Sequence, residues 1–215
     1  MSLATLGNCQ HYWKFDSTTN VGNVFTDTIN GATAVTSATA TFATDATFEG
    51  LNFTDPANYY MDFSTLNVIG QLTVIAVVGY KGGGTAYGFC SKKSSTDLKF
   101  QSWVSGNAAS LNTGVGVNSA AIVAQTEPHI VTYGSQLDPG GIFVIPDDGT
   151  KVTNSAAQES TGCSAQAEFT WGRKDDGTAP DPLQRLYELA IYSGNVSLES
   201  DYAAEIAALM TQYNL

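Results

Sequence analysis

Acidic residues that could hydrolyse a sugar are scattered along the chain. A retaining glycoside hydrolase places two carboxyl groups about 5 to 5.5 Å apart, and alternate residues of one strand can supply them because their side chains share a face. The glutamates form no such strand pair: Glu49, Glu127, Glu159, Glu168, Glu188, Glu199 and Glu205. Glu188 lies in a strand-like run, "LYELAIY", but has no acidic partner two or five residues later. These spacings predict no glycosidase centre.

The two histidines also lack a recognisable catalytic motif. Gln10, His11 and Tyr12 have the residue types of a polysaccharide lyase site, but their position favours an edge strand. His129 follows Pro128 at the start of a strand-like run, which favours a hydrogen-bonded structural histidine. Spacing alone leaves a Ser-His-Asp arrangement open, although the chain has no Gly-x-Ser-x-Gly nucleophile turn. We therefore predict that the protein is not an enzyme.

A carbohydrate-binding surface is compatible with the residue types present. An aromatic ring covers the apolar face of a sugar, while amides and hydroxyls bind its rim. Strand-like runs supply such side chains, and the polar stretch Ser105 to Asn118 is predicted to be a loop beside them. The candidate sugar contacts are Tyr80, Tyr87, Gln101, Trp103 and Tyr133. The alternative is that these aromatic rings fill the core of the fold.

Composition and charge exclude several classes of partner. The net charge is −11, and residues 101 to 215 hold 4 basic and 13 acidic residues against 5 and 7 in residues 1 to 100. Neutralising phosphates requires clustered Lys and Arg, so we expect neither nucleic acid nor an anionic membrane as a partner. The longest apolar run, Leu72 to Tyr80, is about half as long as a membrane-spanning helix. The N-terminus lacks the basic and apolar segments of a secretory signal, which predicts synthesis in a cytoplasm, or assembly there into a larger particle.

The pattern of the chain predicts one all-β domain over residues 1–215. Short runs rich in β-branched and aromatic residues alternate with Gly, Asn and Asp, which is typical of an antiparallel sandwich. The last segment instead has helical spacing, and we expect a helix over 198–212 with Ser197 as its N-cap. Its apolar face would comprise Leu198, Tyr202, Ile206, Leu209, Met210 and Tyr213, and would pack on the sandwich. The three cysteines, Cys9, Cys90 and Cys163, have irregular spacing, so we expect buried free thiols.

Several of these stretches resemble the concanavalin A-like, laminin-G-like jelly-roll domains of bacterial and phage proteins. The opening "WKFDSTTNVGNVFTDTINGATA" is similar to that family's first strand and turn. "WGRKDDG", followed by "RLYELAIYSGNVSLESDYAAEIAALMTQYNL", resembles its last strands and terminal helix. The sequence departs from the family where "TEPH" replaces a usual tryptophan and where "IPDDG" replaces a Val-Asn-Gly turn. The resemblance implies a jelly roll that spans nearly the whole chain.

The resemblance also implies a calcium ion between an early turn and the penultimate strand. The ligands would be Asp27, carbonyl groups near Asn30 and Gly31, and Glu188, whose oxygen atoms suit calcium. The alternative is that Asp27 only caps its own turn.

Two functions remain open at the level of the sequence. The first is a non-catalytic virion protein, such as a phage capsid decoration, head fibre or tail component, that binds capsid or tail proteins, self-associates and contacts cell-surface glycan. The second is a polysaccharide-active enzyme or a carbohydrate-binding module of the same fold. A pair of carboxylates, or a His/Tyr pair, that converges in the concave groove would favour the second function. A groove with three or more exposed aromatic rings in a row would also favour it.

Overall fold

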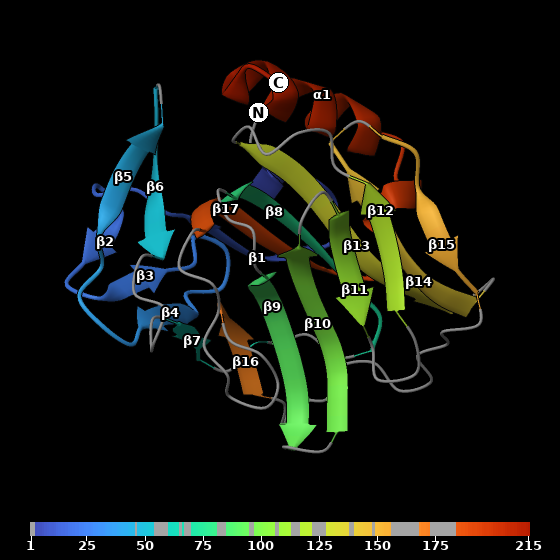
Figure 1. Ribbon diagram of the computed structural model, residues 1–215, viewed down its shortest axis with the longest axis horizontal. Coiled ribbons are helices and arrows are strands. Elements are labelled where there is room, and N and C mark those ends of the chain that lie inside the picture. The colour runs from blue at the N-terminus through green and yellow to red at the C-terminus, as the bar shows by residue number, and fades with distance from the viewer. Residues whose placement is uncertain are drawn as a thin grey trace.

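The protein is a β-sandwich with one helix on its outside, seen in a computed structural model (Figure 1). The predicted antiparallel β-sandwich with a C-terminal helix is thereby confirmed. The structure describes residues 3–45, 47–53, 60–64, 66, 70–80, 85–94, 97–105, 108–112, 117–121, 128–137, 140–147, 149–155, 168–172 and 184–215.

Within these residues, eight strands form the sheet that lies behind in Figure 1. Its order is β15 (Val152–Asn154), β14 (Gly140–Pro146), β13 (His129–Leu137), β8 (Leu72–Tyr80), β17 (Gln184–Ser193), β6 (Phe48–Phe53) and β5 (Phe42–Asp45). The eighth strand, β1 (Cys9–Lys14), pairs with the second half of β17, while β6 pairs with its first half. A short 3-10 helix, η1 (Leu3–Thr5), precedes β1.

The second sheet has nine strands within the described residues, and β9 to β12 lie in front in Figure 1. Its order is β12 (Val117–Ala121), β11 (Ala108–Asn112), β10 (Asp97–Ser105), β9 (Thr85–Ser94), β16 (Glu168–Trp171), β7 (Met61–Phe63), β4 (Thr33–Thr36), β3 (Val24–Thr26) and β2 (Asn20–Val21). The predicted loop Ser105 to Asn118 is therefore wrong, because its described residues include β11 and the start of β12.

The core between the two sheets is rich in aromatic side chains. Trp13 packs on Phe63, whose ring lies 5.8 Å from that of Phe89, and Phe89 in turn packs on Phe100 and Phe169. All of these side chains are buried. Burying one large apolar side chain contributes on the order of 2 kcal/mol, so this cluster is a main source of the fold's stability.

A second core lies on the other side of the eight-stranded sheet, under helix α1 (Tyr202–Tyr213). Ile206, Leu209 and Tyr213 of the helix pack there with Ile75 and Val77 of β8. Both faces of β8 are therefore covered, and all nine of its residues are buried. This explains why the β8 sequence is apolar on both faces, apart from Thr73, instead of alternating.

The helix begins later than the sequence predicts. Val196–Leu198 form a 3-10 turn, η2, in which the Asn195 side chain accepts a hydrogen bond from the Ser197 backbone N–H. The N-cap of α1 is Asp201, so the predicted N-cap at Ser197 is wrong. Leu198 consequently lies outside the helix and is 74% exposed, whereas the other predicted apolar positions pack on the second core. No described helix is long and apolar enough to cross a bilayer.

Candidate functional site

The outer face of the nine-stranded sheet carries the predicted sugar contacts that reach the surface. Strand register aligns Tyr87 of β9 with Trp103 of β10, then Ser110 of β11 and Ser119 of β12. We call these four residues the outer row. Neighbouring strands are about 4.8 Å apart, so the row crosses three intervals, or about 14 Å. Both aromatic rings are half-buried, which leaves part of each accessible.

A β-bulge sets the orientation of the first ring in the outer row. Gly88 and Phe89 together lie opposite Ser102, so Phe89 enters the core although Tyr87, two residues earlier, lies on the outer face. The Ser102 hydroxyl accepts a hydrogen bond of 2.9 Å from the Phe89 backbone N–H. A Cβ atom at Gly88 would lie 2.5 Å from the Ser102 Oγ, so a larger residue there would displace this hydroxyl. Sequence alternation alone does not show this change of register.

A second row of side chains runs beside the first on the same face. Gln101 lies two residues from Trp103 and is aligned with Asn112, while Thr170 is aligned with Asp62 across β16 and β7. Gln101 is only 4% exposed, and its side-chain Nε2 has no hydrogen-bond partner. A buried donor without a partner costs about 1 to 3 kcal/mol.

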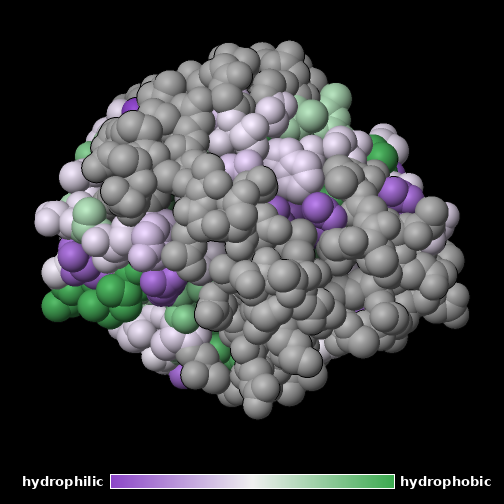
Figure 2. Space-filling model, turned by 60° about the horizontal axis from the view of Figure 1, so that its bottom comes forward, coloured by the Kyte–Doolittle hydropathy of each residue, from purple (hydrophilic) through white to green (hydrophobic). Residues whose placement is uncertain are grey.

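The end of the second row at β3 and β4 is apolar. Val24 is aligned with Val35, and Val21 of the edge strand β2 is 81% exposed. Figure 2 shows a hydrophobic group on the side where β2 to β4 lie, and polar surface between the grey atoms nearer the middle. The polar and aromatic part of the face is thus separate from the valines.

Two of the predicted sugar contacts lie inside the molecule. Tyr80 and Tyr133 are each 2% exposed and belong to the core between the sheets. Burial raises the pKa of the Tyr133 hydroxyl well above its usual range. The structure therefore brings Tyr87, Gln101 and Trp103 together and corrects the prediction for the other two, whose strands are covered on both faces. Ser110, Asn112 and Thr170 were missed, although alternation in "AASLN" could have identified the first two.

The Asp27 carboxylate, a predicted calcium ligand, accepts hydrogen bonds from groups of the protein on both of its oxygen atoms. Its Oδ1 accepts hydrogen bonds from the backbone N–H groups of Tyr12 and Ile29, at 2.8 and 2.9 Å. Its Oδ2 accepts the Asn30 N–H at 2.8 Å and lies 2.9 Å from the His11 Nδ1. Burial would raise the pKa of Asp27, but these hydrogen bonds lower it below its usual value. A carboxylate offers about four lone-pair positions, and all four are directed at protein groups here.

Glu188, the other predicted calcium carboxylate, joins the last strand to the helix. Its Oε1 accepts hydrogen bonds from the Tyr213 hydroxyl at 2.8 Å and from the Gln212 Nε2 at 3.0 Å. Its Oε2 accepts a bond of 3.0 Å from the Tyr12 hydroxyl. Tyr12 thus lies between the two carboxylates, with its amide on Asp27 and its hydroxyl on Glu188.

The residues that the resemblance assigns to calcium therefore do not fit that ion. The side-chain nitrogen of Asn30 donates to the Gln10 carbonyl, and both carboxylates are engaged as described. No group of three or more His, Cys, Asp or Glu side chains in the described part of the chain could hold a metal ion. Asp27 instead caps its own turn, the alternative that the sequence left open.

Each histidine is fixed by an aspartate in the same way. His129 Nδ1 lies 3.1 Å from Asp147 Oδ2, and the other oxygen of Asp147 accepts the Ile130 backbone N–H at 2.9 Å. His11 and Asp27 repeat this arrangement through the Tyr12 N–H. Cys9 lies close to the pair of His11 and Asp27. Burial and the charge of Asp27 raise the pKa of the Cys9 thiol to about 12. A protonated thiol is a poor nucleophile, so these groups fit a structural role.

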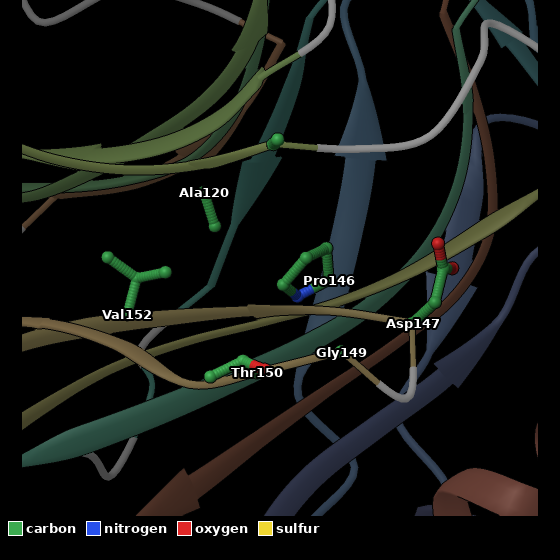
Figure 3. A pocket seen from close by; sticks show the side chains of 7 residues that line it. Ala120, Pro146, Asp147, Gly149, Thr150 and Val152 are labelled. Carbon is green, nitrogen blue, oxygen red and sulfur yellow. The ribbon is translucent and has the colours of Figure 1, made fainter.

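A shallow pocket of about 300 Å³ lies between β12 and the segment after β14. Ala120, Pro146 and Val152 give it a mostly apolar lining, and the carboxyl group of Asp147 lies apart from them at one end (Figure 3). Because that carboxylate already binds His129 and Ile130, the pocket offers few free polar groups to a ligand.

No protein-family model and no curated protein matches the sequence. The fold is similar to domain 4 of AbnA, a GH43 extracellular arabinanase from Geobacillus stearothermophilus, in complex with arabinotriose, with a TM-score of 0.60 and 15% identity. That match covers 91% of this chain and 98% of the other. Trypanosoma rangeli sialidase in complex with sialic acid matches with a TM-score of 0.63 and 13% identity, over 95% of this chain and 33% of the other.

The receptor binding domain of botulinum neurotoxin mosaic serotype C/D is also similar, with a TM-score of 0.66 and 8% identity, over 94% of this chain and 51% of the other. The chain thus spans about a third of the sialidase and half of the toxin domain. At these identities the likeness shows a shared fold, a β-sandwich of the jelly-roll kind.

Proposed function

We propose that the protein is a carbohydrate-binding module without catalytic activity, and that it holds a glycan on the outer row. The observation that carries this proposal is the pairing of two half-buried rings, Tyr87 and Trp103, on adjacent strands of the outer face. Gln101, whose side-chain Nε2 is buried without a partner, lies beside them. The rings offer apolar platforms to sugar faces. The exposed Ser119 hydroxyl, which lies 2.7 Å from the Ser110 hydroxyl, offers a hydrogen bond to a sugar oxygen.

The charges on this face favour a neutral glycan. Among the described side chains of the two rows, Asp62 alone is charged. An anionic sugar needs Lys or Arg to replace the water that it loses on binding, and the described rows contain neither. The rows cross several strands, which suits an extended chain of sugar units more than a single ring.

The structural neighbours support a glycan role. One was solved with arabinotriose and another with sialic acid. A glycosidase, however, needs two carboxyl groups close together. Among the described side chains of the two rows, Asp62 is the single carboxyl group. We therefore expect binding without hydrolysis.

Titration calorimetry with neutral polysaccharides, including arabinan, xylan and β-glucan, tests the proposal. We expect one of them to bind, and Trp103→Ala to weaken its binding about tenfold or more, because losing a stacked ring removes on the order of 1.4 kcal/mol or more. Val35→Ala is a matched control on the same face and should leave affinity unchanged. Release of reducing sugars, or equal affinity of Trp103→Ala and the unchanged protein, would contradict the proposal.

Decoration of a virus particle stays a prediction from the sequence. The same holds for capsid or tail partners and for self-association. Mass spectrometry of purified particles from the source organism would test all three. A glycan-binding face would be compatible with that location, since a particle can use such a face to contact a cell surface.

A further inference from the structure

A second pocket lies on the helix side of the molecule, where the end of β1, the start of β6 and the C-terminal end of α1 meet. Figure 1 shows β6 on the side of the sandwich toward which this end of α1 points. The pocket has a volume of about 340 Å³, within the range of small-molecule sites. Its lining includes Lys14, Asp16, Thr47, Phe48, Glu49 and Gln212. We call it the helix-end pocket.

One wall of the helix-end pocket carries an ion pair. Lys14 Nζ lies 3.1 Å from Asp16 Oδ2. The other Asp16 oxygen accepts bonds from the backbone N–H groups of Thr18 and Thr19 and from the Thr18 hydroxyl. Asp16 is thus committed to its own turn, whereas the lysine is exposed and keeps two further N–H groups for a ligand.

The other lining residues offer acceptors and an aromatic ring. Glu49 Oε2 accepts bonds from the Ser17 N–H and hydroxyl, at 2.9 and 2.7 Å. Its Oε1 has no partner within the described residues. The Gln212 amide donates to Glu188, which leaves its carbonyl oxygen for other contacts. The Phe48 ring is half-buried, and one part of it packs against Tyr213 at 4.8 Å.

The helix-end pocket presents charges of both signs, which disfavours a ligand that carries a single charge. A cation would approach the ammonium group of Lys14, and an anion would approach the Glu49 and Asp16 carboxylates. A metal ion would need at least three suitable side chains, and no such group is present in the described residues. The ligand that remains is uncharged, donates hydrogen bonds to Glu49 and Gln212, accepts one from Lys14, and has an apolar face for Phe48.

We propose that the helix-end pocket binds one ring of a neutral saccharide, independently of the outer row. Sugar hydroxyls both donate and accept hydrogen bonds, as this lining requires. The C–H face of the ring would lie on Phe48. This assignment goes beyond the proposed function, since the pocket lies on the helix side and shares no residue with the outer row.

The test is a titration of the isotope-labelled full chain, followed by amide chemical shifts. The probes are glucose, galactose, mannose, xylose and arabinose at millimolar concentration, with glucuronate and protonated glucosamine as charged counterparts. We expect at least one neutral sugar to shift the amides of residues 47–49 and 212, and both charged sugars to bind more weakly. Trp103→Ala should leave these shifts unchanged, so failure of the outer row would not affect the result.

Two variants test the lining. Glu49→Gln should weaken binding about tenfold, because a hydrogen bond to a charged group is replaced by a neutral one. Lys14→Met removes the ammonium group that would donate to the sugar, and should weaken binding severalfold without unfolding the chain because this side chain is exposed. Glu199→Gln, an exposed glutamate away from the pocket, is the matched control. Absence of shifts with all five neutral sugars, tighter binding of a charged one, or full affinity in both variants would each overturn the proposal.

Discussion

Removing the carboxylate of Glu188 should destabilise the protein strongly, because this group holds β1, β17 and α1 together. Glu188→Ala leaves the hydroxyls of Tyr12 and Tyr213 buried without their shared acceptor. Each orphaned group costs about 1 to 3 kcal/mol, so we expect a loss of about 4 kcal/mol in the free energy of unfolding. For a chain of this length, that corresponds to a fall in Tm of roughly 8 to 16 °C.

Glu188→Gln separates the effect of the charge from that of the acceptor. The glutamine keeps one oxygen in place, and a tyrosine hydroxyl can rotate to accept from its amide group. We expect a loss of about 1 to 2 kcal/mol, the difference between charged and neutral hydrogen bonds. Urea unfolding followed by circular dichroism measures both variants against the unchanged chain. An alanine variant that loses less than about 1 kcal/mol would refute the role assigned to these hydrogen bonds.

The stability of the protein also tests whether it binds calcium. Since the oxygen atoms of Glu188 and Asp27 are engaged by protein donors, the Tm of the unchanged protein should not respond to calcium or to a chelator. A rise in Tm with calcium that disappears in Glu188→Gln would show that the network rearranges to bind the ion, and would contradict our conclusion that the site does not fit it.

Three further predictions concern the cores and titrating groups. The lowered pKa of Asp27 means that its contribution to stability is present above the pKa of an unfolded aspartate and is lost as the pH falls below about 4; Asp27→Asn should flatten this acid limb in pH-dependent unfolding curves. The Cys9 thiol, with its pKa raised to about 12, should resist iodoacetamide near neutral pH until denaturant is added, as mass spectrometry would show. Leu209→Ala should cost about 2 to 5 kcal/mol and Leu198→Ala less than about 0.5 kcal/mol in urea unfolding, although the sequence places both on one helical face.

The sequence predicts best where one local property decides the outcome. The nine residues of β8 could be assigned to a buried strand because all but Thr73 are apolar or largely apolar, and the Thr73 hydroxyl donates to the Gly194 carbonyl. The body of α1 was equally predictable from the spacing of Ile206, Leu209 and Tyr213. Its start was not, because Asn195 caps a 3-10 turn before the helix, and Ser197 and Asn195 are equally acceptable caps from sequence alone.

The candidate site depends on long-range pairing that local patterns do not contain. Gln101 and Trp103 share a face because they are two residues apart, which the sequence does show. The position of Tyr87 beside Trp103 requires the bulge at Gly88, and that of Thr170 beside Asp62 requires β16 to pair with β7. The burial of Tyr80 and Tyr133 likewise follows from where their strands lie in the sheet, not from their own sequence.

The placement of the helix determines which face can bind a ligand. α1 and the N-terminal segment cover the outer face of the eight-stranded sheet, so every residue of β8 can be apolar. Among the described elements no helix covers the nine-stranded sheet, and there the side chains alternate between the core and a polar, aromatic surface. The unpartnered amide of Gln101 lies on this second sheet. Among the described elements, the helix thus packs on one sheet and the proposed glycan site lies on the other, while the C-terminal end of the helix lines the helix-end pocket.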